Sequence, residues 1–176
     1  MRKTIKDLIQ EHEKIMHVLE IVEKVQGEKK LGEKEELKFY SELAEFIQTF
    51  ADKCHHGKEE VNLYHILAPL GDLSERKMVE ELLEEHNQSR ILQKELQKAT
   101  EEGRLMDAAT KALEYRKLLL SHIYHENEEM FPSMEKRITD ELDETIYGRF
   151  LAVEKMTLGD AGIARIDEMI KGWESL

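Results

Sequence analysis

Residues 122–132 read HIYHENEEMFP and place a histidine, His122, four residues before a carboxylate, Glu126. On an α-helix, residues four apart stack on one face, with their Cβ atoms roughly 6 Å apart. Such a His/Glu pair is often a solvent-exposed ion pair that contributes about a few tenths of a kcal/mol. A metal ion can also bind the pair, so the stretch needs a second signal before it indicates a site.

A second stretch repeats this arrangement. Residues 54–64 read CHHGKEEVNLY, in which His55 stands four residues before Glu59. Each carboxylate is followed, four and five residues later, by an apolar and an aromatic residue, namely Leu63-Tyr64 and Met130-Phe131. Two copies of one ligand pattern predict a site with two related halves.

Composition narrows the class of protein. The chain has 176 residues, a formal net charge of −12 and one cysteine, Cys54. This length fits one domain. The acidic balance argues against a nucleic-acid or anionic membrane partner, because both favour clustered Lys and Arg. A lone cysteine suits a reducing compartment, no apolar run is long enough to span a membrane, and the N-terminus has no secretory signal pattern, so we expect a soluble cytoplasmic protein.

The pattern of apolar residues predicts an all-α fold. Glu, Lys and Leu are abundant, there are two prolines, and no alternating β-branched run indicates a strand. Helical apolar spacing covers about residues 4–26, 33–67, 73–101 and 104–131. The predicted boundaries are residues 27–32, where glycine can adopt a left-handed conformation, residues 68–71, a capping box at 72–75, residues 101–103, and Pro132. Four amphipathic helices joined by short loops predict an antiparallel up-down four-helix bundle.

The remainder of the chain extends beyond this bundle. We assign residues 1–135 to the bundle and residues 136–176 to a C-terminal helical extension. Two groups of apolar residues at helical spacing support the extension: Leu142, Ile146, Phe150 and Leu151, and then Ile163, Ile166, Met169 and Ile170. The extension could pack on the bundle, form a homodimer or bind a partner protein, and the sequence leaves these possibilities open.

Each predicted bundle helix carries one histidine on its apolar stripe, and two helices add a carboxylate. These residues are His12, His55, Glu59, His86, His122 and Glu126. Any single buried histidine is best explained as a core residue with a hydrogen-bond partner. Burying all six groups without an ion would cost several kcal/mol per unpaired charge. Imidazole with carboxylate suits iron, manganese or zinc, and two carboxylates suit two ions.

At these positions the chain resembles the hemerythrin-like (HHE cation-binding) domains, over about residues 1–135. The resemblance rests on Glu11-His12, on HHGKEE at residues 55–60, on Glu85-His86 with Arg90, and on residues 122–132. It implies a four-helix bundle with a non-haem di-iron centre, oxo- or hydroxo-bridged. The four stripe histidines would be terminal ligands, and Glu59 and Glu126 would bridge. Zinc or manganese remains an alternative to iron.

One position departs from the pattern of the oxygen-carrying hemerythrins. Those proteins have two histidines four apart on the third helix, but here Arg90 stands four residues after His86. One ion would then lack a ligand. His56 is the first substitute, although a rotation of about 100° per residue turns it toward the edge of the His55 face. We therefore expect His56 to have an outer or surface role, with metal binding as the alternative.

Three functions are compatible with the sequence. The first is a di-iron protein that binds or senses O₂, NO, peroxide or iron. The second is a di-iron enzyme that reduces peroxide or NO, or that resembles the iron-sulfur cluster repair proteins, so the sequence does not decide whether the chain is an enzyme. The third is a metal-free helical interaction bundle whose histidines are packed core.

Overall fold

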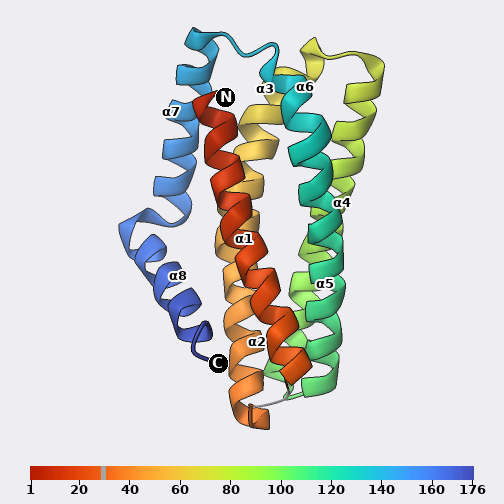
Figure 1. The fold of residues 1–176 in the computed structure, drawn as a ribbon, viewed down its shortest axis with the longest axis vertical. Helices are drawn as coiled ribbons and strands as arrows, with labels where there is room; N and C mark the ends of the chain where they lie inside the picture. Colours follow the sequence, from red (N-terminus) through yellow and green to blue (C-terminus); the bar gives the residue numbers. More distant parts are fainter. Residues whose placement is uncertain (29–30) are drawn as a thin grey trace.

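A computed structural model describes residues 1–28 and 31–176 and shows a bundle of four long helical segments with a helical arm along one side (Figure 1). In chain order the elements are α1 (Lys3–Glu28), α2 (Glu33–Phe46), η1 (Ile47–His56), η2 (Glu59–Tyr64), α3 (His65–Leu67), η3 (Ala68–Leu70), α4 (Leu73–Glu101), α5 (Leu105–His125), η4 (Glu126–Met130), α6 (Phe131–Glu135), α7 (Asp140–Thr157) and α8 (Gly159–Trp173). The predicted all-α four-helix bundle is confirmed. Within the described ranges, none of the helices combines the length and apolar composition that a membrane crossing needs.

Two of the four segments change helix type along their length. The run from α2 to η3 is continuous, as predicted for residues 33–67, but η1 and η2 within it are π-helices. The fourth segment passes from α5 through the π-helix η4 into α6. A π-helix bonds each N–H to the carbonyl five residues back, which widens the turn, and such turns concentrate at functional sites. Both His/Glu pairs lie in or beside these π-helical turns.

Several predicted boundaries differ from the structure. Pro132 does not end the fourth segment, because it lies in the first turn of α6, where a missing N–H is tolerated. Gly27 is inside α1, and Gly32 caps α2 with a φ of −70°, so neither glycine takes the left-handed conformation expected of residues 27–32. Lys29 and Lys30 of that stretch lie outside the described residues. Gly103, after α4, does have a positive φ of 68°.

The predicted capping box at the start of α4 is half formed. The Asp72 carboxylate accepts a hydrogen bond from the Glu75 backbone N–H at 2.9 Å, as an N-cap should. The Glu75 side chain does not return the bond. Its carboxylate instead accepts from the Ser133 hydroxyl at 2.6 Å and pairs with Arg137. The Glu75 carboxylate therefore pairs with Arg137 and does not cap the backbone N–H of Asp72.

The core consists of two apolar clusters with a polar layer between them. On α1, Leu8 belongs to one cluster and Ile15 to the other, and His12 lies between the two in sequence. On α4, Leu82 and Leu96 flank His86 in the same way. The apolar clusters therefore hold the histidine-bearing turns at one level of the bundle.

The C-terminal arm, α7 and α8, lies along the bundle beside α1 and α2 (Figure 1). At one end, the Asp143 carboxylate accepts hydrogen bonds from the backbone N–H groups of Lys3 and Thr4 and from the Thr4 hydroxyl, so α7 caps α1. At the other end, the Trp173 indole N–H donates to Glu42 of α2 at 2.9 Å. Of the open possibilities for residues 136–176, this structure has the arm packed on the bundle, and a separate domain boundary at residue 135 stays a prediction.

Candidate metal centre

The six candidate ligands come from all four bundle segments and meet in the polar layer. His12 lies in α1, His55 in η1, Glu59 in η2, His86 in α4, His122 in α5 and Glu126 in η4. Each of the six is at most 1% exposed. Their ligand atoms form two groups that share Glu59. The structure therefore brings together all the residues that the sequence put forward.

The first group consists of His12, His55, Glu59 and Glu126, whose ligand atoms all lie within 4.8 Å of one another. His12 Nε2 is 3.1 Å from Glu126 Oε2. His55 Nε2 is 3.4 Å from Glu59 Oε1. Two imidazole nitrogens and two carboxylate oxygens thus face one point, which is a donor set that a first-row transition metal accepts.

The second group consists of His56, Glu59, His86 and His122, again within 4.8 Å. The His86 and His122 Nε2 atoms are 3.0 Å apart, and Glu59 Oε2 is 3.5 Å from His86 Nε2. The other oxygen of Glu126, Oε1, is 3.1 Å from His122 Nε2. Each carboxylate therefore has one oxygen near each group, as a bridging ligand requires.

His56 lies inside the centre, contrary to the expectation of an edge position. Its ring is fully buried and stacks on His86, with ring centroids 3.8 Å apart. The rotation of about 100° per residue holds for an α-helix, whereas residues 47–56 form a wider π-helix in which consecutive side chains diverge less. His55 and His56 consequently both point inward, one into each group.

Arg90 is directed away from the ligand atoms. Its guanidinium bonds to Asp52 at 2.7 Å and to Glu60 at 2.6 Å, and its side chain is 32% exposed. The third helix thus lacks a second histidine, and His56 from the second helical segment lies beside His86 and His122 instead. Outside the centre, the remaining histidines, His17, His65 and His125, belong to neither group.

The far sides of the rings are held by a set of polar partners. In four histidines the Nδ1 atom has a hydrogen-bond partner at 2.7–2.9 Å: Asn127 for His12, Glu11 for His55, Glu60 for His86 and Glu85 for His122. Such bonds fix the tautomer and leave Nε2 free for a metal. These partners had no role in the sequence prediction, although all four stand in the quoted motifs.

Unpartnered polar atoms concentrate at this centre. In the described part of the chain, most buried side-chain N and O atoms without a hydrogen-bond partner belong to it, and they are Nε2 of His12, His55 and His56, Nδ1 of His56, both oxygens of Glu59 and Oε2 of Glu126. Leaving one such atom unpaired costs about 1–3 kcal/mol. A cation would bind these atoms, so the residues present fit a metal.

Burial changes the proton affinity of these groups. It lowers the pKa of the His55 imidazole to about 4, and burial together with the neighbouring His86 lowers the pKa of His56 well below its ordinary value. Neutral imidazoles offer a lone pair to a metal. Burial and the nearby Glu126 carboxylate raise the pKa of Glu59 well above its usual range. Two close carboxylates repel each other, and a cation between them relieves that repulsion.

His122 behaves differently from its neighbours. Burial lowers its pKa, but the Glu126 and Glu85 carboxylates outweigh burial and raise the pKa to about 9. Metal ligands must be deprotonated, so a metal competes with a proton at this ring.

Tyr64 is a polar member of the centre that sequence reasoning missed. Its buried hydroxyl donates a hydrogen bond to Glu126 Oε1. Tyr64 comes five residues after Glu59, and in an α-helix residues five apart point in different directions. From the sequence, Tyr64 is therefore only the aromatic neighbour of Leu63 and is not placed near the ligands. Glu59 and Tyr64 begin and end the π-helix η2, and only a prediction of that wider helix would have placed Tyr64 beside the ligands.

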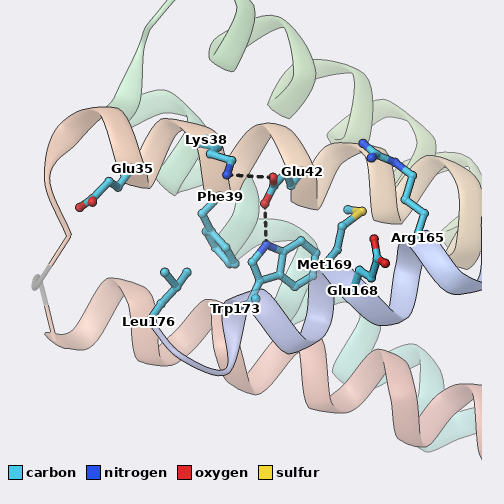
Figure 2. Close-up of a pocket in the computed structure, with 10 residues that line it drawn as sticks. Glu35, Lys38, Phe39, Glu42, Arg165, Glu168, Met169, Trp173 and Leu176 are labelled. Atoms are coloured by element: carbon cyan, nitrogen blue, oxygen red, sulfur yellow. Dashed lines mark hydrogen bonds and ion pairs between the residues drawn. The ribbon is translucent and has the colours of Figure 1, made fainter.

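A surface groove lies away from the centre. It has a volume of about 430 Å³ and lies between α2 and α8, where Figure 2 shows Glu42 held by Lys38 and Trp173. None of the candidate metal ligands lines it. Since the candidate ligands are almost inaccessible to solvent, the centre suits ions and molecules of a few atoms.

The family comparison covers the part of the chain that builds this centre. The model of the hemerythrin HHE cation-binding domain matches residues 3–134, which include every candidate ligand. The comparisons with curated proteins and with solved structures give no match. The buried His/Glu groups agree with the cation binding that the family description states. The chain therefore belongs to the hemerythrin family of HHE cation-binding domains.

Proposed function

We propose that this chain is a non-haem di-iron protein whose carboxylate-bridged centre binds or senses O₂, NO, peroxide or iron. The observation that carries the proposal is the pair of four-residue groups that share Glu59, with Glu126 reaching both. Shared carboxylates are the feature that distinguishes a two-metal centre from two separate sites. A family that binds cations supports the presence of a metal at these residues.

The ligand assignment follows the two groups. His12 and His55 would hold one ion, and His56, His86 and His122 the other, with Glu59 and Glu126 as bridges. The sequence had placed the incomplete half beside Arg90. His56 supplies the donor missing there, so the His12–His55 half now has fewer protein donors than the His56–His86–His122 half. Iron is proposed because the resemblance to the hemerythrin-like domains implies it, while the donor set accepts iron, zinc and manganese alike.

The protein's own residues would act by holding and shielding the centre. A bound iron pair would supply the redox chemistry that a small oxidant requires. Glu11, Glu60, Glu85 and Asn127 orient the imidazoles through Nδ1. The Tyr64 hydroxyl donates a hydrogen bond to Glu126 Oε1 and so fixes the position of that carboxylate, and the apolar clusters on either side exclude water.

The near-complete burial of the centre supports a small ligand. Every candidate ligand side chain is at most 1% exposed, so a substrate larger than a few atoms would need a substantial opening of the bundle. O₂, NO and hydrogen peroxide can enter through brief local openings.

The test is stopped-flow absorbance of the anaerobically reduced, iron-loaded protein mixed with O₂ and, separately, with NO. We expect a charge-transfer band from at least one mixture, and we expect His122→Ala to abolish it because one ion loses a ligand. An iron-loaded protein with no spectral change toward either O₂ or NO would contradict the binding of these two ligands while leaving metal binding intact.

An enzyme is the second candidate, and Tyr64 is the observation in its favour. A buried phenol bonded to a bridging carboxylate can donate a proton during peroxide or NO reduction. Repeated turnover of hydrogen peroxide or NO, slowed in Tyr64→Phe at unchanged iron content, would favour the enzyme. Reaction of a single equivalent would favour the binding protein.

A further inference from the structure

A buried lysine connects the centre to the C-terminal arm. The Lys58 side chain is 1% exposed, and its ammonium bonds to Asp7 at 2.8 Å, to Glu11 at 2.6 Å and to Glu154 at 3.4 Å. Asp7 and Glu11 lie on α1, whereas Glu154 lies on α7. A buried cation needs such partners, because an unpaired charge in the interior costs several kcal/mol.

Lys58 is connected to the centre through Glu11. One oxygen of Glu11 accepts from the Lys58 ammonium, and the other accepts the Nδ1–H of His55 at 2.9 Å. The position of the Glu11 carboxylate is therefore set from both sides. If Lys58 moves, Glu11 loses one of its two constraints and the His55 ring can reorient.

Helix α7 covers Lys58. Besides Glu154, the buried Phe150 ring has its centroid 5.7 Å from the Lys58 ammonium, within the range of a cation–π contact. A side chain at Gly57, next to Lys58, would meet Val153 of α7 at 3.6 Å, so the backbone there runs close beneath the arm. The range matched by the family ends at residue 134, before α7 begins.

The opposite half of the centre has a different outer contact. Arg90 bonds to Asp52 and Glu60, and Glu60 accepts the Nδ1–H of His86 at 2.7 Å. This chain of contacts is equivalent to that of Lys58, but both acidic partners of Arg90 belong to the second bundle segment and the arginine is one-third exposed.

We propose that α7 of the C-terminal arm positions one half of the metal centre, through the contacts Glu154–Lys58–Glu11–His55. Lys58 and Glu154 are positioning residues for the ion held by His12 and His55, and the ion held by His56, His86 and His122 is independent of the arm. The inference rests on the proposed two-ion centre for its metal readout. Displacing the arm would loosen one ion and leave the other in place.

The test compares variants on the arm with matched controls. Glu154→Ala removes the arm's carboxylate from a one-third exposed position, where the fold tolerates it, and Glu154→Gln keeps an oxygen near Lys58. Arg165→Gln breaks another ion pair between the arm and the bundle, the one with Glu45, which has no contact with Lys58. Arg90→Met perturbs the opposite half.

The first measurement is release of Fe²⁺ to a strong chelator under anaerobic conditions, in which two phases report the two ions. His56→Ala identifies the phase of the second half. We expect Glu154→Ala to accelerate the His55-half phase about three- to tenfold, below the 10–100-fold typical of a direct outer partner, with a smaller effect in Glu154→Gln. Arg165→Gln should change neither phase. Arg90→Met should accelerate only the phase of the His56–His86–His122 half. Equal acceleration of both phases by Glu154→Ala, or none, would overturn the proposal.

The second measurement uses the metal-free protein and separates the two proposals. The Nδ1–H proton of His55, observed by ¹H–¹⁵N NMR, should exchange with water faster in Glu154→Ala than in wild type or in Arg165→Gln. Unchanged exchange would overturn the coupling to the arm. A wild-type chain that takes up no metal would overturn the proposed function, whereas faster exchange in Glu154→Ala would still support the contact chain.

Discussion

The two halves of the centre share Glu59 and yet are held by different surroundings. The His12–His55 half faces α1, and its outer contacts run through the buried Lys58 to α7. The His56–His86–His122 half faces α4 and α5, and its outer cation, Arg90, is partly in solvent. Two His-x-x-x-Glu stretches of the same spacing therefore do not produce two equivalent sites, because the helices packed opposite them decide the outer contacts.

Removal of the shared carboxylate should have the largest effect, because it affects both halves. In Glu59→Gln the bridging charge is lost, and we expect affinity for both ions to fall by on the order of a hundredfold or more, beyond the effect of losing an outer partner. The metal-free protein should remain folded, since the change removes a buried carboxylate with no hydrogen-bond partner. Iron titration followed by absorbance measures the loss. Glu128→Gln, which changes an exposed carboxylate within residues 122–132, is the control, and retention of both ions by Glu59→Gln would contradict the bridge.

Removal of His56 should separate the two halves. We expect His56→Ala to bind about one iron ion firmly and to lose the second at least tenfold more readily, because the second half falls from three imidazoles to two. Arg90→Met should weaken that same ion less, since Arg90 acts through Glu60. Metal analysis after gel filtration distinguishes the two variants. A His56→Ala protein with full iron content would return His56 to the outer role that α-helical geometry predicts.

The two carboxylates proposed as bridges can be distinguished through Tyr64. Glu126 accepts a hydrogen bond from the Tyr64 hydroxyl, whereas neither oxygen of Glu59 has a hydrogen-bond partner. In the metal-free protein, Tyr64→Phe should lower the free energy of unfolding by about 1.5–3 kcal/mol, the range for a hydrogen bond to a charged group. Urea denaturation measures it, with the exposed Tyr124→Phe expected to stay within about 0.5 kcal/mol. Equal stability of the two variants would contradict a stabilising hydrogen bond from Tyr64 to Glu126.

The smallest effect is expected at the anchor of the arm. Burial raises the pKa of Asp143, but hydrogen bonds from Thr4 and Lys3 outweigh it and bring the pKa below the usual value. A carboxylate with a lowered pKa stabilises the fold above the unfolded-state pKa of about 4, and that contribution disappears as the pH falls through the folded-state pKa. Asp143→Asn should therefore cost about 1 kcal/mol at neutral pH, as for a lost helix cap, and progressively less below about pH 4. Unfolding curves at several pH values test this, and a cost that grows in acid would contradict it.

The fold could be predicted from the sequence because its apolar spacing is regular. The stripes that carry His12 and His86 follow α-helical periodicity, and the structure has α-helices there. The π-helical turns could not be predicted in the same way. They depend on hydrogen bonds five residues back, which the spacing of apolar residues around Phe50 and Leu63 does not encode. The predicted helix end at Pro132 was wrong because of the π-helix before it. A new α-helix, α6, begins after η4, and proline is tolerated in its first turn.

The sequence indicated which stripe residues share a level of the bundle, and it missed those that the π-turns redirect, while the metal-binding role of all of them stays a prediction. His12, His55, Glu59, His86, His122 and Glu126 share one buried level, as expected. His56 and Tyr64 enter the centre because the helix is wider there. The contact between Lys58 and Glu154 joins residues 96 apart in the chain, and no local pattern reveals such a partner.

Metal analysis of the purified chain tests the central claim most directly. After anaerobic reconstitution with Fe²⁺ and removal of excess metal, with Zn²⁺ and Mn²⁺ compared in parallel, the two ligand groups predict about two iron ions per chain. Fewer than about one ion of any of these metals per chain would contradict the two-metal centre and would support a bundle whose buried histidines serve packing alone.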